Sequence, residues 1–198
     1  MNFLAHIFLT KKHTPLMIGN FLADFLKGKK QLEHLPKGVL EGIYLHRKID
    51  HFTDHHELVK VGYQRLKPSQ GRYASVITDI YFDYFLIKNW SKYTETPLST
   101  FLPPVYEALL DHIDLYPKKI QKRVRLMIAD NWLFQYGKLD GLRFTFDRVA
   151  DRTSFDHNLG KAVDDLVKYE AEFDAEFNVF FPELIDFVNK EMANFQAE

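Results

Sequence analysis

Apolar residues recur at intervals of three and four along nearly the whole chain, rather than in strict alternation. This spacing puts apolar side chains on one face of a helix, and it predicts an all-α protein. Pro15 suits the first turn of a helix, Gly28 and Gly71 suit helix ends, and Pro103-Pro104 marks a break or a helix start. The predicted helices cover residues 2–10, 15–28, 36–56, 57–67, 70–93, 98–115, 117–136, 139–150, 156–178 and 180–195.

Composition favours one folded unit. The chain has 198 residues, 46% of them hydrophobic, which is enough for a sizeable core. No linker or repeat divides it, so we expect a single-domain multi-helix bundle over residues 1–198. The absence of cysteine excludes disulfides, thiolate metal sites and catalytic thiols.

Neither targeting nor membrane insertion is indicated by the sequence. The apolar segment 3–9 is short, contains His6 and lacks a preceding basic region, so it is a poor signal peptide. No uncharged apolar run approaches the ~18 residues of a membrane span. We therefore expect a soluble, cytoplasmic protein that does not contact a membrane.

Two carboxylates in an apolar stretch give the first indication of chemistry. Asp79 and Asp83 lie four residues apart within the stretch 76–87, and so share one helix face among apolar neighbours. An unpaired carboxylate in such surroundings normally neutralises, pairs or binds a metal. Structural helices also carry such pairs on solvated faces, but this stretch is otherwise apolar.

The same spacing occurs twice upstream. His46, Asp50 and Asp54 follow one another at steps of four, and so do Asn20 and Asp24. Three segments thus offer ligand-type side chains, which predicts a divalent metal site; Asp54 is assigned to orienting a neighbour rather than to ligation. The predicted metal ligands are Asp24, His46, Asp50, Asp79 and Asp83.

This ligand set favours a particular ion and reaction. Oxygen ligands with one imidazole suit Mn²⁺ or Mg²⁺ better than Zn²⁺. Such a cation neutralises phosphoryl oxygens and lowers the pKa of bound water, which suits hydrolysis of a phosphate ester. The predicted catalytic residues are therefore His46 and Asp50, with Arg47 to bind an anionic substrate.

The general acid is less defined by the sequence. His51, His55 and His56 follow the ligand segment, and any of them could protonate a leaving alkoxide; we take His55 as the candidate. His6 lies on the apolar face of the first predicted helix and is assigned to the core. These assignments rest on spacing alone.

Charge is unevenly distributed. Residues 151–198 hold 12 acidic and 4 basic side chains, so the excess of lysine and arginine lies in residues 1–150. This bias favours a partner with a local acidic surface, while the near-neutral net charge of −1 argues against a nucleic-acid binder. The basic run 118–125 is the candidate docking surface, although such runs are often only solvated. Its predicted substrate-binding residues, with Arg47, are Lys118, Lys119, Lys122 and Arg123.

Several ordered motifs resemble the acyl carrier protein phosphodiesterase family, also called holo-acyl-carrier-protein hydrolases. They are Met1-Asn-Phe-Leu-Ala-His6, Gly19-Asn-Phe-Leu-Ala-Asp-Phe25, His46-Arg-Lys-Ile-Asp50 with Thr53-Asp54, Asp79-x-x-x-Asp83 followed by Phe85-Leu86 and Trp90, and Asn131-Trp-Leu-x-x-Tyr136. The similarity is dense over residues 1–90 and thinner beyond.

The resemblance implies an all-helical fold related to HD-domain metal-dependent phosphohydrolases and a Mn²⁺-type cofactor. It also implies removal of 4′-phosphopantetheine from the serine of holo-acyl carrier protein, whose acidic helix suits the basic bias of residues 1–150. The chain departs from the HD pattern because it has no adjacent His-Asp dipeptide. Two alternatives stay open: an HD-type phosphohydrolase acting on nucleotides or other small phosphoesters, and a non-catalytic helical module whose carboxylates pair with arginines such as Arg47.

Overall fold

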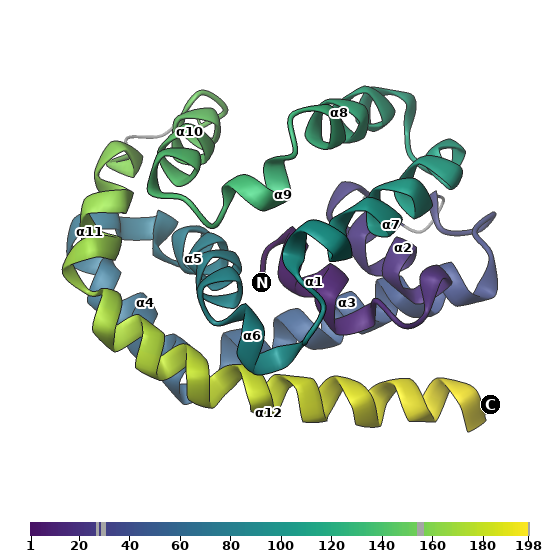
Figure 1. Ribbon diagram of the computed structural model, residues 1–198, viewed down its shortest axis with the longest axis horizontal. Coiled ribbons are helices and arrows are strands. Elements are labelled where there is room, and N and C mark those ends of the chain that lie inside the picture. Colours follow the sequence, from purple (N-terminus) through teal and green to yellow (C-terminus); the bar gives the residue numbers. More distant parts are fainter. Residues whose placement is uncertain (27, 29–30, 154–156, 198) are drawn as a thin grey trace.

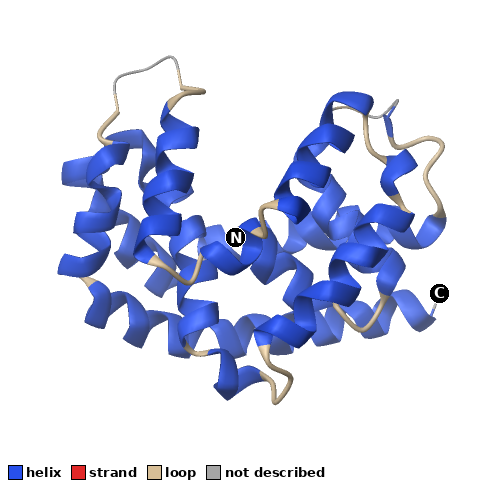
Figure 2. Cartoon of the chain, turned by 45° about the horizontal axis from the view of Figure 1, so that its top comes forward, coloured by secondary structure: helices blue, strands red, loops and turns tan. Residues whose placement is uncertain are grey.

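The structure is a computed structural model that describes residues 1–26, 28, 31–153 and 157–197. Its regular structure in these ranges is helical, without a strand, so the prediction of an all-α fold is confirmed (Figure 2). The first half contains α1 (Phe3–Thr10), α2 (Thr14–Leu22), η1 (Ala23–Phe25), α3 (Lys37–His55), α4 (Glu57–Gln70), η3 (Gly71–Tyr73) and α5 (Ala74–Lys88). The second half contains α6 (Trp90–Tyr93), α7 (Leu98–Asp111), η4 (Ile113–Leu115), α8 (Lys118–Ala129), α9 (Trp132–Gln135), α10 (Leu139–Ala150), η5 (Leu159–Lys161), α11 (Ala162–Lys168) and α12 (Glu170–Ala197).

Helices α2 and α3 make the most extensive contact in the fold. Their backbones meet at Gly19 and Gly42: a Cβ on Gly19 would lie 1.9 Å from the carbonyl oxygen of Val39. Only residues without a side chain allow two helix backbones to approach this closely. The crossing matters for the site because Asn20 follows Gly19, and His46 lies one turn of α3 beyond Gly42.

The apolar α1 is buried rather than exposed at an edge. Leu4 and Ile7 are fully buried, and α1 packs against α2 and α5 (Figure 1). This burial explains the nearly continuous apolar character of the segment. Within the described ranges, no helix has both the length and the apolar composition needed to cross a membrane.

The long helix α12 closes one side of the molecule. It runs along the lower edge in Figure 1 and packs against α3, α4 and α5. Its aromatic residues Phe173, Phe177, Phe180 and Phe181 are fully buried, and Phe177 stacks on Phe181 with ring centroids 4.8 Å apart. These aromatic residues therefore belong to the core.

Helix breaks differ from the predicted ones in the second half of the chain. The break predicted near residue 179 is wrong, because α12 continues through Pro182, where the buried aromatic face holds the helix together. The helix boundary lies at Tyr169 instead.

Pro103-Pro104 lies inside α7 rather than at a break. The helix predicted over residues 117–136 is interrupted at Asn131, whose φ of 51° is left-handed, a conformation that asparagine tolerates.

Candidate metal centre

Helices α1 and α3 bring two histidines and a carboxylate together. One ligand-type atom from each of His6, His46 and Asp50 lies within 4.8 Å of the others. The two imidazole rings stack with centroids 4.1 Å apart. Asp50 Oδ1 lies 3.2 Å from His6 Nε2, and Asp50 Oδ2 lies 3.1 Å from His46 Nε2. His46 and Asp50 share a face of α3 because they are four residues apart, and α1 supplies the third member.

Several buried atoms of this cluster have no hydrogen bond. Both ring nitrogens of His6, and Oδ1 of Asp50, are buried without a hydrogen-bond partner among the described residues, although the two side chains are in contact. Leaving a buried polar group unpaired costs roughly 1–3 kcal/mol. Together with His46, whose ligand atom lies within 4.8 Å of one from each of the other two, these residues fit the ligand set of a metal ion.

Asn20 fixes the orientation of the His46 ring. Its amide nitrogen donates to the carbonyl oxygen of His6 at 3.0 Å, which leaves the amide oxygen facing His46 Nδ1 at 3.2 Å. An acceptor at that point favours the tautomer with hydrogen on Nδ1. Nε2 then faces the carboxylates, as in metal sites where the second ring nitrogen of a ligating histidine is held by an acceptor.

The electrostatics of the two histidines differ. Burial, together with the charge of His46, lowers the pKa of His6 to about 4. Burial also lowers the pKa of His46, but hydrogen bonds and charges from Asp24 and Asp50 outweigh burial and raise its pKa to about 9. Burial opposes ionisation of Asp50, yet the two histidines hold its pKa well below the usual range. The cluster thus contains a firmly ionised carboxylate and a neutral imidazole.

Solvent reaches the cluster from its carboxylate edge. The side chains of Asp24 and Asp50 are 39% and 40% exposed, whereas His6 and His46 are nearly buried. Asp24 comes from η1, and its Oδ1 lies 3.5 Å from His46 Nε2. The exposed carboxylates are therefore the groups that a substrate in solution meets first.

Asp79 on α5 faces the beginning of the chain. Its Oδ1 accepts a hydrogen bond of 2.9 Å from the Met1 ammonium, which also lies 3.6 Å from Asp50 Oδ1. Burial raises the pKa of Asp79, and the ammonium opposes that rise. A positive group thus lies between Asp79 and Asp50, which links α5 to the edge of the cluster.

Asp83 has a different set of partners, although it shares a helix face with Asp79. Its two oxygens accept hydrogen bonds of 3.0 and 2.9 Å from the backbone N–H groups of Leu4 and Ala5. The first N–H groups of a helix have no partner within the helix, so Asp83 satisfies two of them for α1. Burial raises the pKa of Asp83 to about 7, and these two N–H groups limit the rise. Asp83 therefore holds α1 in place.

Sequence reasoning and structure agree only in part on this site. Of the five predicted ligands, His46 and Asp50 lie in the cluster, with Asp24 beside His46. Asp79 and Asp83 lie on α5 with the partners described above. His6 was missed because a histidine on an apolar helix face was assigned to the core. The available signal was its place at the end of the motif Met1–His6.

Comparison with known proteins identifies the family. A sequence profile described as acyl carrier protein phosphodiesterase matches residues 1–184. The chain belongs to the acyl carrier protein phosphodiesterase family. A protein of that name from Photorhabdus laumondii is 31% identical over 187 residues, which cover 94% of each chain. Proteins of the same name from Yersinia enterocolitica and Escherichia coli O157:H7 are 29% and 28% identical, over 93% of this chain and 96% of theirs. No solved structure gives a significant match.

The other predicted catalytic residues of this acyl carrier protein phosphodiesterase family member lie outside the cluster. Arg47 is exposed on α3, and its recorded contact is with the ring of Tyr44, 5.7 Å from the guanidinium carbon to the ring centroid. His55 is exposed near the end of α3, where its Nδ1 lies 2.8 Å from the carbonyl oxygen of His51. Neither residue is placed against His6, His46 or Asp50, so their catalytic roles stay predictions.

The basic run forms most of α8. Lys118, Lys119 and Lys122 are exposed, and no ion pair is recorded for them with any described residue. Arg123 is partly buried and lines a pocket instead. The three lysines thus form an accessible cationic surface, hereafter the α8 lysine face, of the kind that steers an acidic partner.

Proposed function

We propose that this protein is a metal-dependent phosphodiesterase that hydrolyses the bond between 4′-phosphopantetheine and the serine of holo-acyl carrier protein, giving apo-acyl carrier protein and 4′-phosphopantetheine. Family membership makes acyl carrier protein phosphodiesterase, a phosphoric diester hydrolase, its activity. The match extends over residues 1–184 and therefore includes the cluster of His6, His46 and Asp50. The name of the relatives supports the substrate, and the chemistry of the cluster supports the cofactor.

One observation carries the metal part of the proposal: buried ring nitrogens of His6 and Oδ1 of Asp50 without hydrogen bonds, gathered with His46 within 4.8 Å. These three residues would hold the ion. Asp24, whose Oδ1 lies 3.5 Å from His46 Nε2, is the nearby carboxylate outside this set. Two imidazoles in the donor set favour Mn²⁺ over Mg²⁺, because Mg²⁺ prefers oxygen ligands. When bound, the cation would neutralise phosphoryl oxygens and lower the pKa of a coordinated water.

The surrounding residues have separable tasks. Asn20 holds the His46 ring so that Nε2 faces the site. Asp83 holds the N–H groups of Leu4 and Ala5 in the first turn of α1, and so positions His6, the next residue. Asp24 is exposed beside His46, so its carboxylate is accessible to accept a proton from an attacking water. The α8 lysine face is the proposed docking surface for the acidic helix of the carrier protein.

The alternative of a non-catalytic module is less well supported. It requires the carboxylates to be paired with arginines such as Arg47. Arg47 lies against Tyr44, and Asp50 contacts histidines instead. The nucleotide alternative uses the same metal chemistry, so it is tested by substrate preference.

The decisive experiment is intact-protein mass spectrometry of holo-acyl carrier protein incubated with the enzyme, with Mn²⁺ or with a chelator. We expect loss of the phosphopantetheine mass only with Mn²⁺. The variants His46→Ala and Asp50→Asn should lose this activity, whereas His34→Ala, an exposed histidine outside the cluster, should retain it.

Each contrary result removes a different part of the proposal. Equal hydrolysis with chelator would refute the metal. Hydrolysis of small nucleotide esters without action on the carrier protein would refute the substrate. Full activity in folded Asp50→Asn protein would refute the proposed ligand set.

A further inference from the structure

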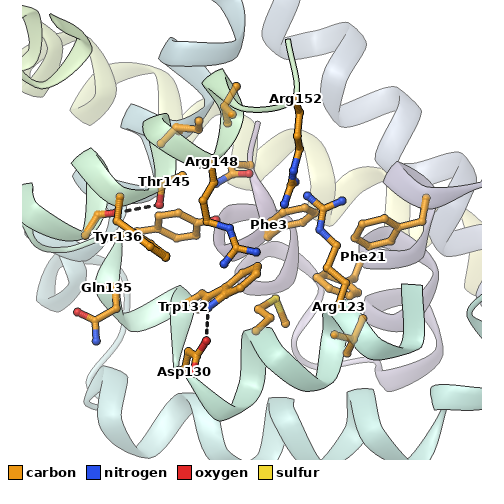
Figure 3. A pocket seen from close by; sticks show the side chains of 18 of the residues that line it. Phe3, Phe21, Arg123, Asp130, Trp132, Gln135, Tyr136, Thr145, Arg148 and Arg152 are labelled. Carbon is orange, nitrogen blue, oxygen red and sulfur yellow. Dashed lines mark hydrogen bonds between the residues drawn. The ribbon is translucent and has the colours of Figure 1, made fainter. Parts of the chain in front are cut away.

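A pocket of about 500 Å³ is lined by side chains other than those of the candidate metal centre. Its walls come from α1, α2, α8, α9 and α10, and include the aromatic residues Phe3, Phe21 and Trp132 (Figure 3). Phe144 of α10 is a further aromatic residue of the lining. Pockets of roughly 300–1,000 Å³ with largely apolar walls and a few polar groups are typical ligand sites. None of the proposed metal ligands lines this pocket.

Three arginines face this apolar space. Arg123 comes from α8, Arg148 from α10 and Arg152 from just beyond α10, and all three line the pocket (Figure 3). No hydrogen bond or ion pair joins any of the three to another described residue. Cations that line one pocket repel one another, and an anion bound among them reduces that repulsion.

Arg148 is held in place by aromatic faces. Its guanidinium carbon lies 4.0 Å from the centroid of the Trp132 ring and 5.4 Å from that of Phe144. Trp132 is itself fixed, because its indole N–H donates to Asp130 Oδ2 at 3.2 Å. Stacking on an aromatic ring orients a guanidinium while its N–H donors stay available. Arg148 is thus an ordered donor at the boundary between apolar and charged surfaces.

The pocket also contains two acids, Asp130 and Asp140, and neither forms an ion pair with one of the three arginines. Asp130 accepts the hydrogen bond from Trp132 instead. An anionic group matches the three guanidinium groups, because arginine binds phosphate and carboxylate through paired N–H donors. An apolar body matches the aromatic wall below them.

We propose that this pocket is a second ligand site that binds an amphipathic anion, a molecule with a phosphate or carboxylate head and an apolar chain. The head lies between Arg123, Arg148 and Arg152, and the chain lies against Phe3 and Trp132. The proposal is independent of the phosphodiesterase reaction, because it concerns binding alone.

The chain offers a built-in reporter for this binding. It has two tryptophans: Trp132 lines the pocket, whereas Trp90 is buried elsewhere among Phe8 and Phe101. Titration with decyl phosphate below its micelle concentration should change the intrinsic fluorescence saturably. The change should persist in Trp90→Phe, in which Trp132 is the remaining tryptophan, and calorimetry should give the same Kd for this variant as for the wild-type protein.

Matched variants and fragments test the two halves of the site. Arg148→Gln and Arg123→Gln, which change different helices, should each raise the Kd for decyl phosphate at least tenfold. Arg143→Gln should leave it unchanged, because Arg143 is on α10 outside the pocket and pairs with Asp164. Inorganic phosphate and 1-decanol should each bind at least tenfold more weakly than decyl phosphate. Comparing the Kd of decanoate with that of decyl phosphate shows whether the site prefers a carboxylate or a phosphate head.

The following results would overturn the proposal. Absence of saturable binding by both fluorescence and calorimetry would remove the site. Equal affinity for inorganic phosphate or for decanol would remove the amphipathic ligand. Unchanged affinity in both folded arginine variants would remove the role of the guanidinium groups.

Discussion

The crossing of α2 and α3 makes Gly19→Ala a sharp test of how the fold builds the metal centre. The added Cβ would lie 1.9 Å from the carbonyl oxygen of Val39, 2.8 Å from its carbonyl carbon and 2.9 Å from Cα of Gly42. Ordinary contact begins near 3.4 Å, so the helices must separate by about 1.5 Å. All three atoms are backbone, so no side-chain rotation relieves the clash.

The expected consequences follow from this displacement. Overpacking of a core costs typically 1–3 kcal/mol, and a clash between backbones lies at the upper end, so we expect the free energy of unfolding to fall by about 3 kcal/mol. Asn20 follows Gly19 and orients His46, so the site is displaced as well. A shift of ~1 Å in a catalytic group can cost about 10²-fold in rate, which we expect for kcat/KM on holo-acyl carrier protein.

Urea denaturation followed by far-ultraviolet circular dichroism measures the first effect, and the slope of the transition should stay constant. Gly160→Ala is the matched control, since a Cβ there has no neighbour within 4 Å, and its free energy of unfolding should change by less than about 0.5 kcal/mol. A Gly19→Ala protein with the wild-type midpoint and activity would refute the argument that the close crossing is required.

Three further predictions concern other parts of the molecule. Asp83→Ala leaves the N–H groups of Leu4 and Ala5 without acceptors in the core, so the free energy of unfolding measured in urea should fall by roughly 2–4 kcal/mol. An unchanged midpoint would show that the carboxylate does not hold α1. Replacing all three residues of the α8 lysine face by glutamate should lower kcat/KM for holo-acyl carrier protein about tenfold at low ionic strength, and by a smaller factor in high salt. Lys67→Glu on α4 is the control and should leave kcat/KM unchanged. Equal losses in both proteins would refute a specific docking surface. At about 100 times its Kd, Mn²⁺ should stabilise the wild-type protein by about 2.7 kcal/mol, seen as a higher Tm, but not Asp50→Asn; an equal rise in both would place the ion elsewhere.

Local patterns in the sequence predicted most of the helices. The spacing of apolar residues can be read within any two turns of sequence, and this local pattern predicts the fold class and the central part of most helices. Helix ends were less predictable: α12 continues through Pro182 because buried aromatic residues hold it against α3, α4 and α5. This packing involves segments far away in the sequence, so rules based on neighbouring residues cannot predict it.

The candidate site divides in the same way. Because His46 and Asp50 are one turn apart on a single helix, their spacing alone placed them on one face. The role of His6 depends on how α1 packs on α3, and the different partners of Asp79 and Asp83 depend on where the first residues of the chain lie against α5. The pocket likewise combines side chains from the first 25 residues with side chains from residues 123–152. The sequence by itself determined the helices and the residue types available for chemistry, because these follow from short-range geometry. Only tertiary packing decided which of those side chains meet, because their partners are separated by tens of residues along the chain.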